Sequence, residues 1–160
     1  VFLRSFLNCY AVDILPNDGY VFNEHAVHGP PDKIFEEAAF LERFRNLLVM
    51  EDGPNLWLTR GTPRAWLEQG KRISVKNAPT RFGTVGYEIV SDVANGKLSA
   101  TISMPTRNPP KEVLLRLRRP KAAPIKSVLV NGKPWKDFDP TKEIVRLHGH
   151  ANTVTVEVRY

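Results

Sequence analysis

The apolar residues change their spacing once along the chain, and this change divides the sequence into two regions. In the first region, residues 1–10 and 34–48 carry apolar side chains at helical intervals, which predicts two amphipathic helices. Asp32 precedes the second of these and is expected to cap it. Residues 13–31 are rich in Pro, Gly, Asn and His, which predicts a long loop between the helices. From Lys71 onward apolar and polar residues alternate, as they do in β-strands.

Residues 45–70 join the two regions. Two short extended patterns flank residues 51–55, whose Gly and Pro predict the turn of a hairpin. A short helix is expected to follow, because Thr62 suits its N-cap and Pro63 its first position. Gly70 then suits the left-handed backbone that often ends a helix. We expect the chain to pass here from helical to sheet structure.

The region after Lys71 predicts a sandwich of short strands. Alternating segments are separated by turn residues, including the Asn-Gly pairs at 95–96 and 131–132, which favour tight hairpin turns. With the first hairpin included, we expect about eight or nine strands. The predicted fold is mainly β, an antiparallel β-sandwich with one or two N-terminal α-helices packed on it. We expect residues 1–45 to be a helical segment and long loop, the tail of a preceding helical domain, and residues 46–160 to be the β-sandwich domain.

Composition and charge limit the class of protein and its partners. Hydrophobic residues make up 42% and charged residues 25% of the 160 positions, the balance of a soluble globular domain with a buried core. No stretch is apolar enough to cross a bilayer, so no membrane partner is expected. The net charge of +6 keeps a nucleic-acid binder as an alternative, but the Lys and Arg residues are spread along the chain, which favours a solvated basic surface and no nucleic-acid partner. The single cysteine, Cys9, has no internal disulfide partner.

The predicted long loop contains a carboxylate and two imidazoles, at Glu24, His25 and His28. Their spacing does not match the zinc-protease pattern, in which two His stand four positions apart on a helix, so no metal site is expected. General acid–base work by Glu24 needs a second carboxyl group across a cleft, which the sequence does not place. We therefore treat the three residues as candidates for a loop that borders a cleft. A small hydrolase that uses them is an alternative; we expect no cofactor and no catalytic residue.

Three tryptophans and one arginine are candidates for carbohydrate binding. A sugar ring presents a face of C–H groups that stacks on an aromatic ring, while a neighbouring arginine bonds its hydroxyls. Trp135 follows a Pro in a predicted turn, which is consistent with exposure. Trp57 and Trp66 lie among apolar neighbours, which favours packing in a core. Arg60 lies close to Trp57 in the sequence and completes the set.

Arg116, Arg118 and Arg119 form a basic segment along one predicted strand. Such a segment is able to form a basic face for an anionic glycan. A solvated outer face of the sheet is the favoured interpretation, because charge on one side of an antiparallel strand usually faces water. The sequence therefore predicts no ligand for these arginines.

Residues 113–160 resemble the last domain of a known group of enzymes. They contain a strand of the form L-R-x-R-x-P within EVLLRLRRP, a strand that ends in V-N-G, and a final strand of alternating valines, NTVTVEVRY. The passage FLERFRNLLVMEDGPNLWLTRGTPRAWL precedes them. From about Phe35 onward the chain resembles the C-terminal β-sandwich of large bacterial glycoside hydrolases and related polysaccharide-active enzymes built on an α/α toroid, with the passage that leads into it from the last toroid helix.

The resemblance implies a supporting role. In such enzymes the catalytic carboxylates lie mainly in the toroid, so the chain is expected to be a non-catalytic C-terminal accessory domain that stabilises the catalytic domain and borders its substrate cleft. The implied partners are the preceding catalytic helical domain of the same polypeptide and a polysaccharide or oligosaccharide, and the implied location is extracellular or periplasmic, in a bacterium. Because the chain does not start with Met, we expect it to be a piece of a longer protein. The alternative is an autonomous carbohydrate-binding module with Trp135 as its stacking platform.

Overall fold

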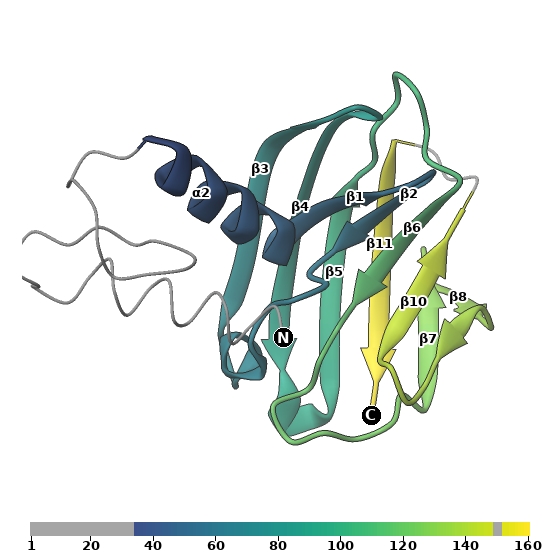
Figure 1. Ribbon diagram of the computed structural model, residues 1–160. Helices are drawn as coiled ribbons and strands as arrows, with labels where there is room; N and C mark the ends of the chain where they lie inside the picture. Colours follow the sequence, from purple (N-terminus) through teal and green to yellow (C-terminus); the bar gives the residue numbers. More distant parts are fainter. Residues whose placement is uncertain (1–33, 149–151) are drawn as a thin grey trace, which may run out of the picture. The chain divides into compact units, whose positions relative to one another are not determined.

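The computed structural model describes residues 34–148 and 152–160 (Figure 1). The chain divides into two units, residues 1–47 and 48–160. An α-helix, α2, covers Ile34–Leu48, which confirms the second helix predicted from the sequence.

The other N-terminal predictions lie outside the described residues. These are the first helix (residues 1–10), the long loop (residues 13–31) and the cap at Asp32. The packing of α2 on the sandwich stays a prediction, as does the division into two domains at residue 45.

In the part of the chain that the structure describes, the second unit contains eleven strands and two short 3-10 helices. The strands are β1 (Val49–Asp52), β2 (Asn55–Leu58), β3 (Arg72–Thr80), β4 (Gly83–Asp92), β5 (Lys97–Ser103), β6 (Glu112–Arg116), β7 (Ser127–Val130), β8 (Lys133–Trp135), β9 (Phe138–Asp139), β10 (Ile144–Leu147) and β11 (Thr153–Arg159). The 3-10 helices are η1 (Arg64–Leu67) and η2 (Val93–Asn95).

The strands form two sheets that lie as two layers (Figure 1). One sheet has the order β1-β2-β6-β10-β9 and the other the order β3-β4-β5-β11-β7-β8. The prediction of a mainly β sandwich is confirmed, with more strands than expected because β8 and β9 are very short. The sheets are not purely antiparallel, since β2 pairs with β6 in parallel.

The core between the sheets follows directly from the alternation in the sequence. Ile89, Ala100, Val156 and Val130 lie next to one another across β4, β5, β11 and β7, and all four are buried. The facing sheet contributes buried residues such as Leu115 to the same cluster. Burying one Val, Leu or Ile side chain stabilises the fold by roughly 1.5–3 kcal/mol. The two-residue period therefore sets both the strand positions and the side that faces inward.

The turns agree with the sequence in part. Asn131 and Gly132 both have positive φ, of 49° and 75°, and join β7 to β8 as the predicted two-residue hairpin turn. Gly70 has the expected left-handed φ of 73°. The turn at Asn95-Gly96 is not a two-residue hairpin: η2 precedes Gly96, which takes the left-handed conformation at its end.

The short helix after the first hairpin differs from the prediction in its type and in its cap. It is the 3-10 helix η1, and Pro63 occupies its N-cap without a side-chain hydrogen bond. The Thr62 hydroxyl instead donates to the carbonyl of Thr59 at 3.3 Å. Thr62 is fully buried, so it holds the preceding turn together instead of capping the helix.

Candidate functional site

The parallel pairing of β2 and β6 brings two arginine-rich segments to one end of the sandwich. Because these strands run in the same direction, residues 59–64 and 116–119 lie at and beyond the same edge. β10 runs antiparallel to β6, so Glu143, directly before β10, lies at this edge as well. In Figure 1 this is the lower end of the sandwich. Three segments that are far apart in the sequence therefore meet there.

The buried carboxylate of Glu143 is the centre of this meeting point. The side chain is 2% exposed and accepts hydrogen bonds from Arg64 Nη1 at 2.9 Å and Arg64 Nη2 at 2.5 Å. It also accepts one from the backbone N–H of Arg119 at 2.9 Å. A two-pronged arginine–carboxylate pair is among the strongest side-chain interactions in proteins. The backbone of Glu143 is left-handed, with φ 57°, a conformation that costs about 1–3 kcal/mol for a residue other than glycine.

Two further arginines bind backbone carbonyls at the same edge. Arg116 donates from Nε to the carbonyl of Lys142 and from Nη1 to that of Arg60, both at 3.2 Å. Arg118 donates from Nη2 to the carbonyl of Thr62. The Nε of Arg118 is buried and has no acceptor among the described residues. An unpaired buried donor costs about 1–3 kcal/mol, so this arginine is held in place at some expense of stability.

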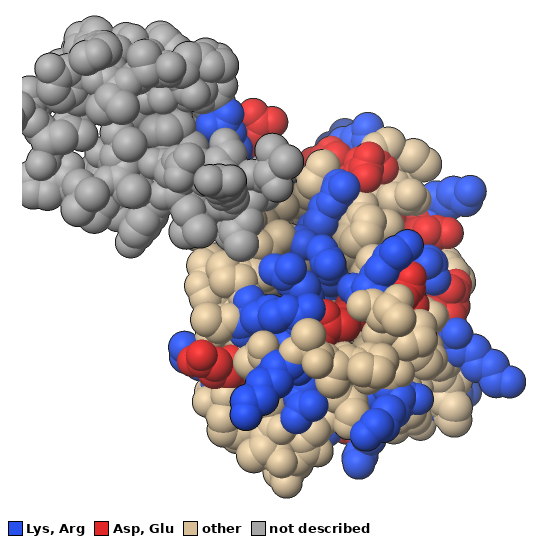
Figure 2. All heavy atoms as spheres, turned by 60° about the horizontal axis from the view of Figure 1, so that its bottom comes forward, with Lys and Arg blue, Asp and Glu red and all other residues tan. Residues whose placement is uncertain are grey.

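Arg64, Arg116, Arg118 and Arg119 surround Glu143, and we call these five residues the arginine cluster. The hydrogen bond to Glu143 raises the pKa of Arg64 above its usual value. Burial lowers the pKa of Arg118, and the charges of Arg116 and Arg64 lower it further. Burial also lowers the pKa of Arg116. Arginine stays charged despite such shifts, so four positive charges meet one negative charge. Figure 2 shows Lys and Arg gathered on this end of the molecule.

The C-terminal residue joins the other sheet to this end. Tyr160 follows β11, and its hydroxyl donates to the carbonyl of Leu117 just before Arg118. Its backbone N–H donates to the carbonyl of Gly96 at 3.0 Å. Burial raises the pKa of Tyr160 above its usual value. The arginine cluster is therefore supported by both sheets.

Trp135 occupies a half-buried position at the end of β8 and packs against the core. Its indole N–H donates to the carbonyls of Arg146 at 3.0 Å and Asp137 at 3.2 Å. Its ring centroid lies 5.8 Å from that of His148. These contacts fix the ring, which is less exposed than its place after a proline suggested. Its role in carbohydrate binding stays a prediction.

The structure brings Trp57 and Arg60 together. The Arg60 guanidinium carbon lies 4.9 Å from the centre of the Trp57 ring, a cation–π arrangement. Arg60 Nη1 and Trp57 Nε1 both donate to Asp52 Oδ2 at 3.3 Å. One face of the Trp57 ring is therefore covered by Arg60, which leaves only the other face for a sugar.

Trp66 lies in a different element, η1, and is half-buried. It borders a shallow groove of about 380 Å³. The groove is lined by Leu48, Trp66, Lys71, Arg72, Ile73 and Ser74. Trp57, Trp66 and Trp135 thus belong to β2, η1 and β8, so the three tryptophans do not come from one strand or one sheet.

The remaining candidates, Glu24, His25 and His28, lie outside the described residues. Within residues 34–148 and 152–160, no group of three or more His, Cys, Asp or Glu side chains is placed to hold a metal ion. Over the same ranges, no helix has both the length and the apolar character needed to span a bilayer.

Sequence reasoning did not find Arg64 and Glu143. It did single out Arg116, Arg118 and Arg119, but favoured a solvated outer face for them. The structure shows instead that all three are half-buried, and that β6 ends at Arg116. The three arginines within four residues were the one feature of the sequence that could have indicated this cluster. Glu143 lies in an unremarkable stretch, and only the pairing of β6 with β10 places it among them.

The comparisons with known proteins are sparse. The chain matches no protein-family model and no curated protein. Among solved structures it is similar to a chain described as "Glycoside hydrolase", with a TM-score of 0.43 and 11% sequence identity. The match covers 73% of this chain and 18% of that chain, so this chain spans less than a fifth of its length.

Proposed function

We propose that this chain is a non-catalytic accessory domain, C-terminal in a carbohydrate-active enzyme, that stabilises the catalytic domain and borders its substrate cleft. The proposal starts from the resemblance of residues 113–160 to the closing sandwich of toroid-based glycoside hydrolases. The proposed partners are the preceding helical catalytic domain and a polysaccharide or oligosaccharide. The proposed location is extracellular or periplasmic.

The observation that carries the proposal is that the segments on which the resemblance rests have structural roles in the sandwich. Leu115 and Leu117, from the L-R-x-R-x-P motif, are fully buried. The V-N-G segment forms the turn after β7, and the final valines of β11 lie in the core. The arginines of the first motif hydrogen-bond to backbone carbonyls or surround Glu143. These are roles in a scaffold, which is what an accessory domain requires.

The test uses the polypeptide encoded immediately before Val1. We expect a helical domain with paired catalytic carboxylates there. Expressed as a separate chain, it should associate with the 160-residue chain, and its thermal midpoint should rise on association. The 160-residue chain alone should release no sugar from a panel of glycans. An upstream region without such a domain, or glycan cleavage by the 160-residue chain itself, refutes the proposal.

The groove beside Trp66 favours a second candidate, an autonomous carbohydrate-binding module. A half-buried tryptophan next to Lys71, Arg72 and Ser74 combines an aromatic surface with hydrogen-bond donors, as sugar recognition requires. Calorimetric titration with neutral oligosaccharides should then show saturable binding that Trp66→Ala abolishes. Loss of binding with Trp135→Ala but not with Trp66→Ala would place the platform at β8 instead. Binding that neither substitution affects would exclude both rings.

A further inference from the structure

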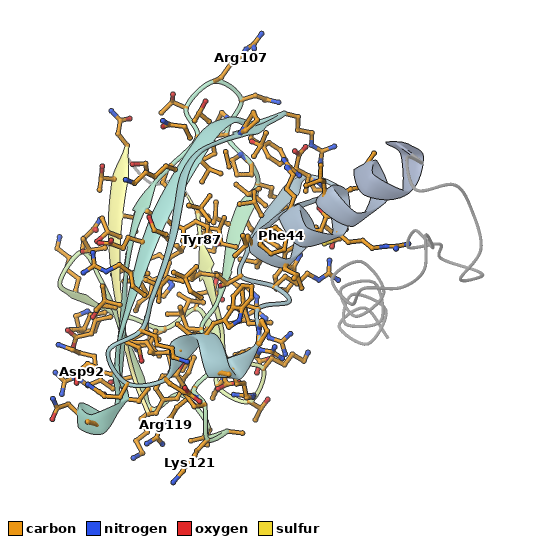
Figure 3. The ribbon with its side chains drawn as sticks, turned by 90° about the vertical axis from the view of Figure 1, so that its left-hand side faces the viewer. Phe44, Tyr87, Asp92, Arg107, Arg119 and Lys121 are labelled. Atoms are coloured by element: carbon orange, nitrogen blue, oxygen red, sulfur yellow. The ribbon has the colours of Figure 1, made fainter. Side chains whose placement is uncertain are left out.

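We propose that the arginine cluster, together with Lys121, binds carboxylate groups of an acidic polysaccharide. This inference rests on the proposed function and specifies the charge of the glycan that borders this end of the sandwich. Arg119 and Lys121 extend from the same loop at the lower end of the sandwich (Figure 3). Lys121 is exposed and Arg119 is half-buried, so both side chains are accessible to a ligand.

The first argument is that most of the positive charges in the cluster are not paired with a carboxylate within the described fold. The carboxylate of Glu143 is engaged by both Nη atoms of Arg64. Arg119 contacts Glu143 through its backbone N–H, and its guanidinium makes no hydrogen bond or ion pair with the described residues. Arg118 binds a neutral carbonyl instead of a carboxylate. The cluster therefore retains guanidinium donors for an external anion.

The second argument is that the arrangement is unfavourable without an anion. Arg64, Arg116 and Arg118 lie close enough that the charges of the first two lower the pKa of the third. The Nε of Arg118 is buried without an acceptor. Mutual repulsion and an unpaired donor both lower the stability of the fold. Groups with such unfavourable surroundings are often found at functional sites. A bound anion lowers the repulsion, so the fold should be more stable when the site is occupied.

The third argument concerns the shape of the ligand. The planar guanidinium matches a planar carboxylate through two parallel hydrogen bonds, which a lysine ammonium does not provide. Carbonyl contacts already fix Arg116 and Arg118, so little side-chain freedom is lost on binding there. A polysaccharide of uronic acids presents one carboxylate on each sugar, which suits several cationic side chains on one surface. A single-stranded nucleic acid would call for stacked aromatic rings, and the cluster contains none.

The test is calorimetric titration of the 160-residue chain with polygalacturonate, and with the same polymer fully methyl-esterified. Polygalacturonate should bind, and the neutral ester should not. Arg119→Gln should weaken binding about tenfold, the equivalent of a charge-assisted hydrogen bond. Arg119→Lys should recover only part of the loss, because lysine keeps the charge without the fork. Binding should also weaken as salt rises.

Arg107→Gln is the matched control. Arg107 is exposed and lies at the opposite end of the sandwich from Arg119 (Figure 3). Its removal changes the net charge by the same amount but should leave the affinity unchanged. Lys121→Gln, at an exposed position, provides a second test that does not depend on the half-buried Arg119.

Four outcomes overturn the proposal. They are absence of polygalacturonate binding, equal binding of the neutral ester, equal loss from Arg107→Gln and Arg119→Gln, and tighter binding of duplex or single-stranded DNA at the same salt. The proposed function is judged separately. If the chain associates with its upstream domain but does not bind polygalacturonate, this inference alone is refuted. If the chain binds polygalacturonate but no catalytic domain precedes Val1, the accessory role alone is refuted.

Discussion

Replacing Glu143 by Gln should strongly lower the free energy of unfolding of the described sandwich, although Gln has nearly the same side-chain volume as Glu. The carboxylate is 2% exposed and accepts three hydrogen bonds, two of them from Arg64. Removing one partner of a buried ion pair costs about 3–5 kcal/mol. The Arg64 side chain is 32% exposed and regains some hydration, so we expect the lower end, about 3 kcal/mol. The neutral amide also leaves four arginines without a negative charge among them.

The assay is urea denaturation followed by circular dichroism, with Glu88→Gln as the control. Glu88 pairs with Arg72 at 2.8 Å, but their side chains are 44% and 61% exposed. An exposed pair contributes about 0–1 kcal/mol, so this variant should stay close to the parent. A loss of about 3 kcal/mol moves the urea midpoint by roughly 1–3 M. Equal losses for the two variants would show that burial of the pair does not decide its contribution.

Three further predictions concern single features of the sandwich. Burial raises the pKa values of Tyr87 and Tyr160 above their ordinary value of 10.0, so above pH 10 both stay neutral in the folded state while they ionise in the unfolded chain. The contribution of these two tyrosines to stability should be constant below pH 10 and fall as pH rises beyond it. Replacing both by Phe should flatten this fall in denaturation curves measured between pH 9 and 11. Gly132→Ala should cost about 1 kcal/mol in urea denaturation, because the turn requires its φ of 75°, and a neutral result would mean that the turn relaxes. Arg60→Ala should change the fluorescence of Trp57, whose ring it covers at 4.9 Å, and an unchanged spectrum would show that the cation–π contact is absent in solution.

The sandwich was predictable because its determinants are local. Alternation along β4 and β11 assigns each side chain to one face, and the inward face is apolar along both strands except at Ser91. The Asn131-Gly132 turn was predictable for the same reason, since positive φ at two successive positions favours these residues. A residue and its immediate neighbours are enough for such inferences.

The arginine cluster was not predictable because it depends on which strands are neighbours. Alternation gives a strand its two faces but does not say that β2 lies beside β6, or that the two run parallel. An antiparallel β2 would send residues 59–64 to the opposite end of the sandwich. Arg64 would then lie far from Glu143, and no sequence pattern would reveal the difference.

This topology gives the arginine cluster two separable roles. Arg64 and Glu143 connect the segment after β2 to the start of β10, so their removal should destabilise the fold whether or not a ligand is present. The Arg119 side chain contributes no hydrogen bond to the described fold, so its removal should cost no stability but should weaken anion binding. If the cluster had only a structural role, Arg119→Gln would leave polygalacturonate binding unchanged, and polygalacturonate would not stabilise the parent chain. The comparison of Arg64 and Arg119 variants, with and without polygalacturonate, therefore distinguishes a structural role from a binding site.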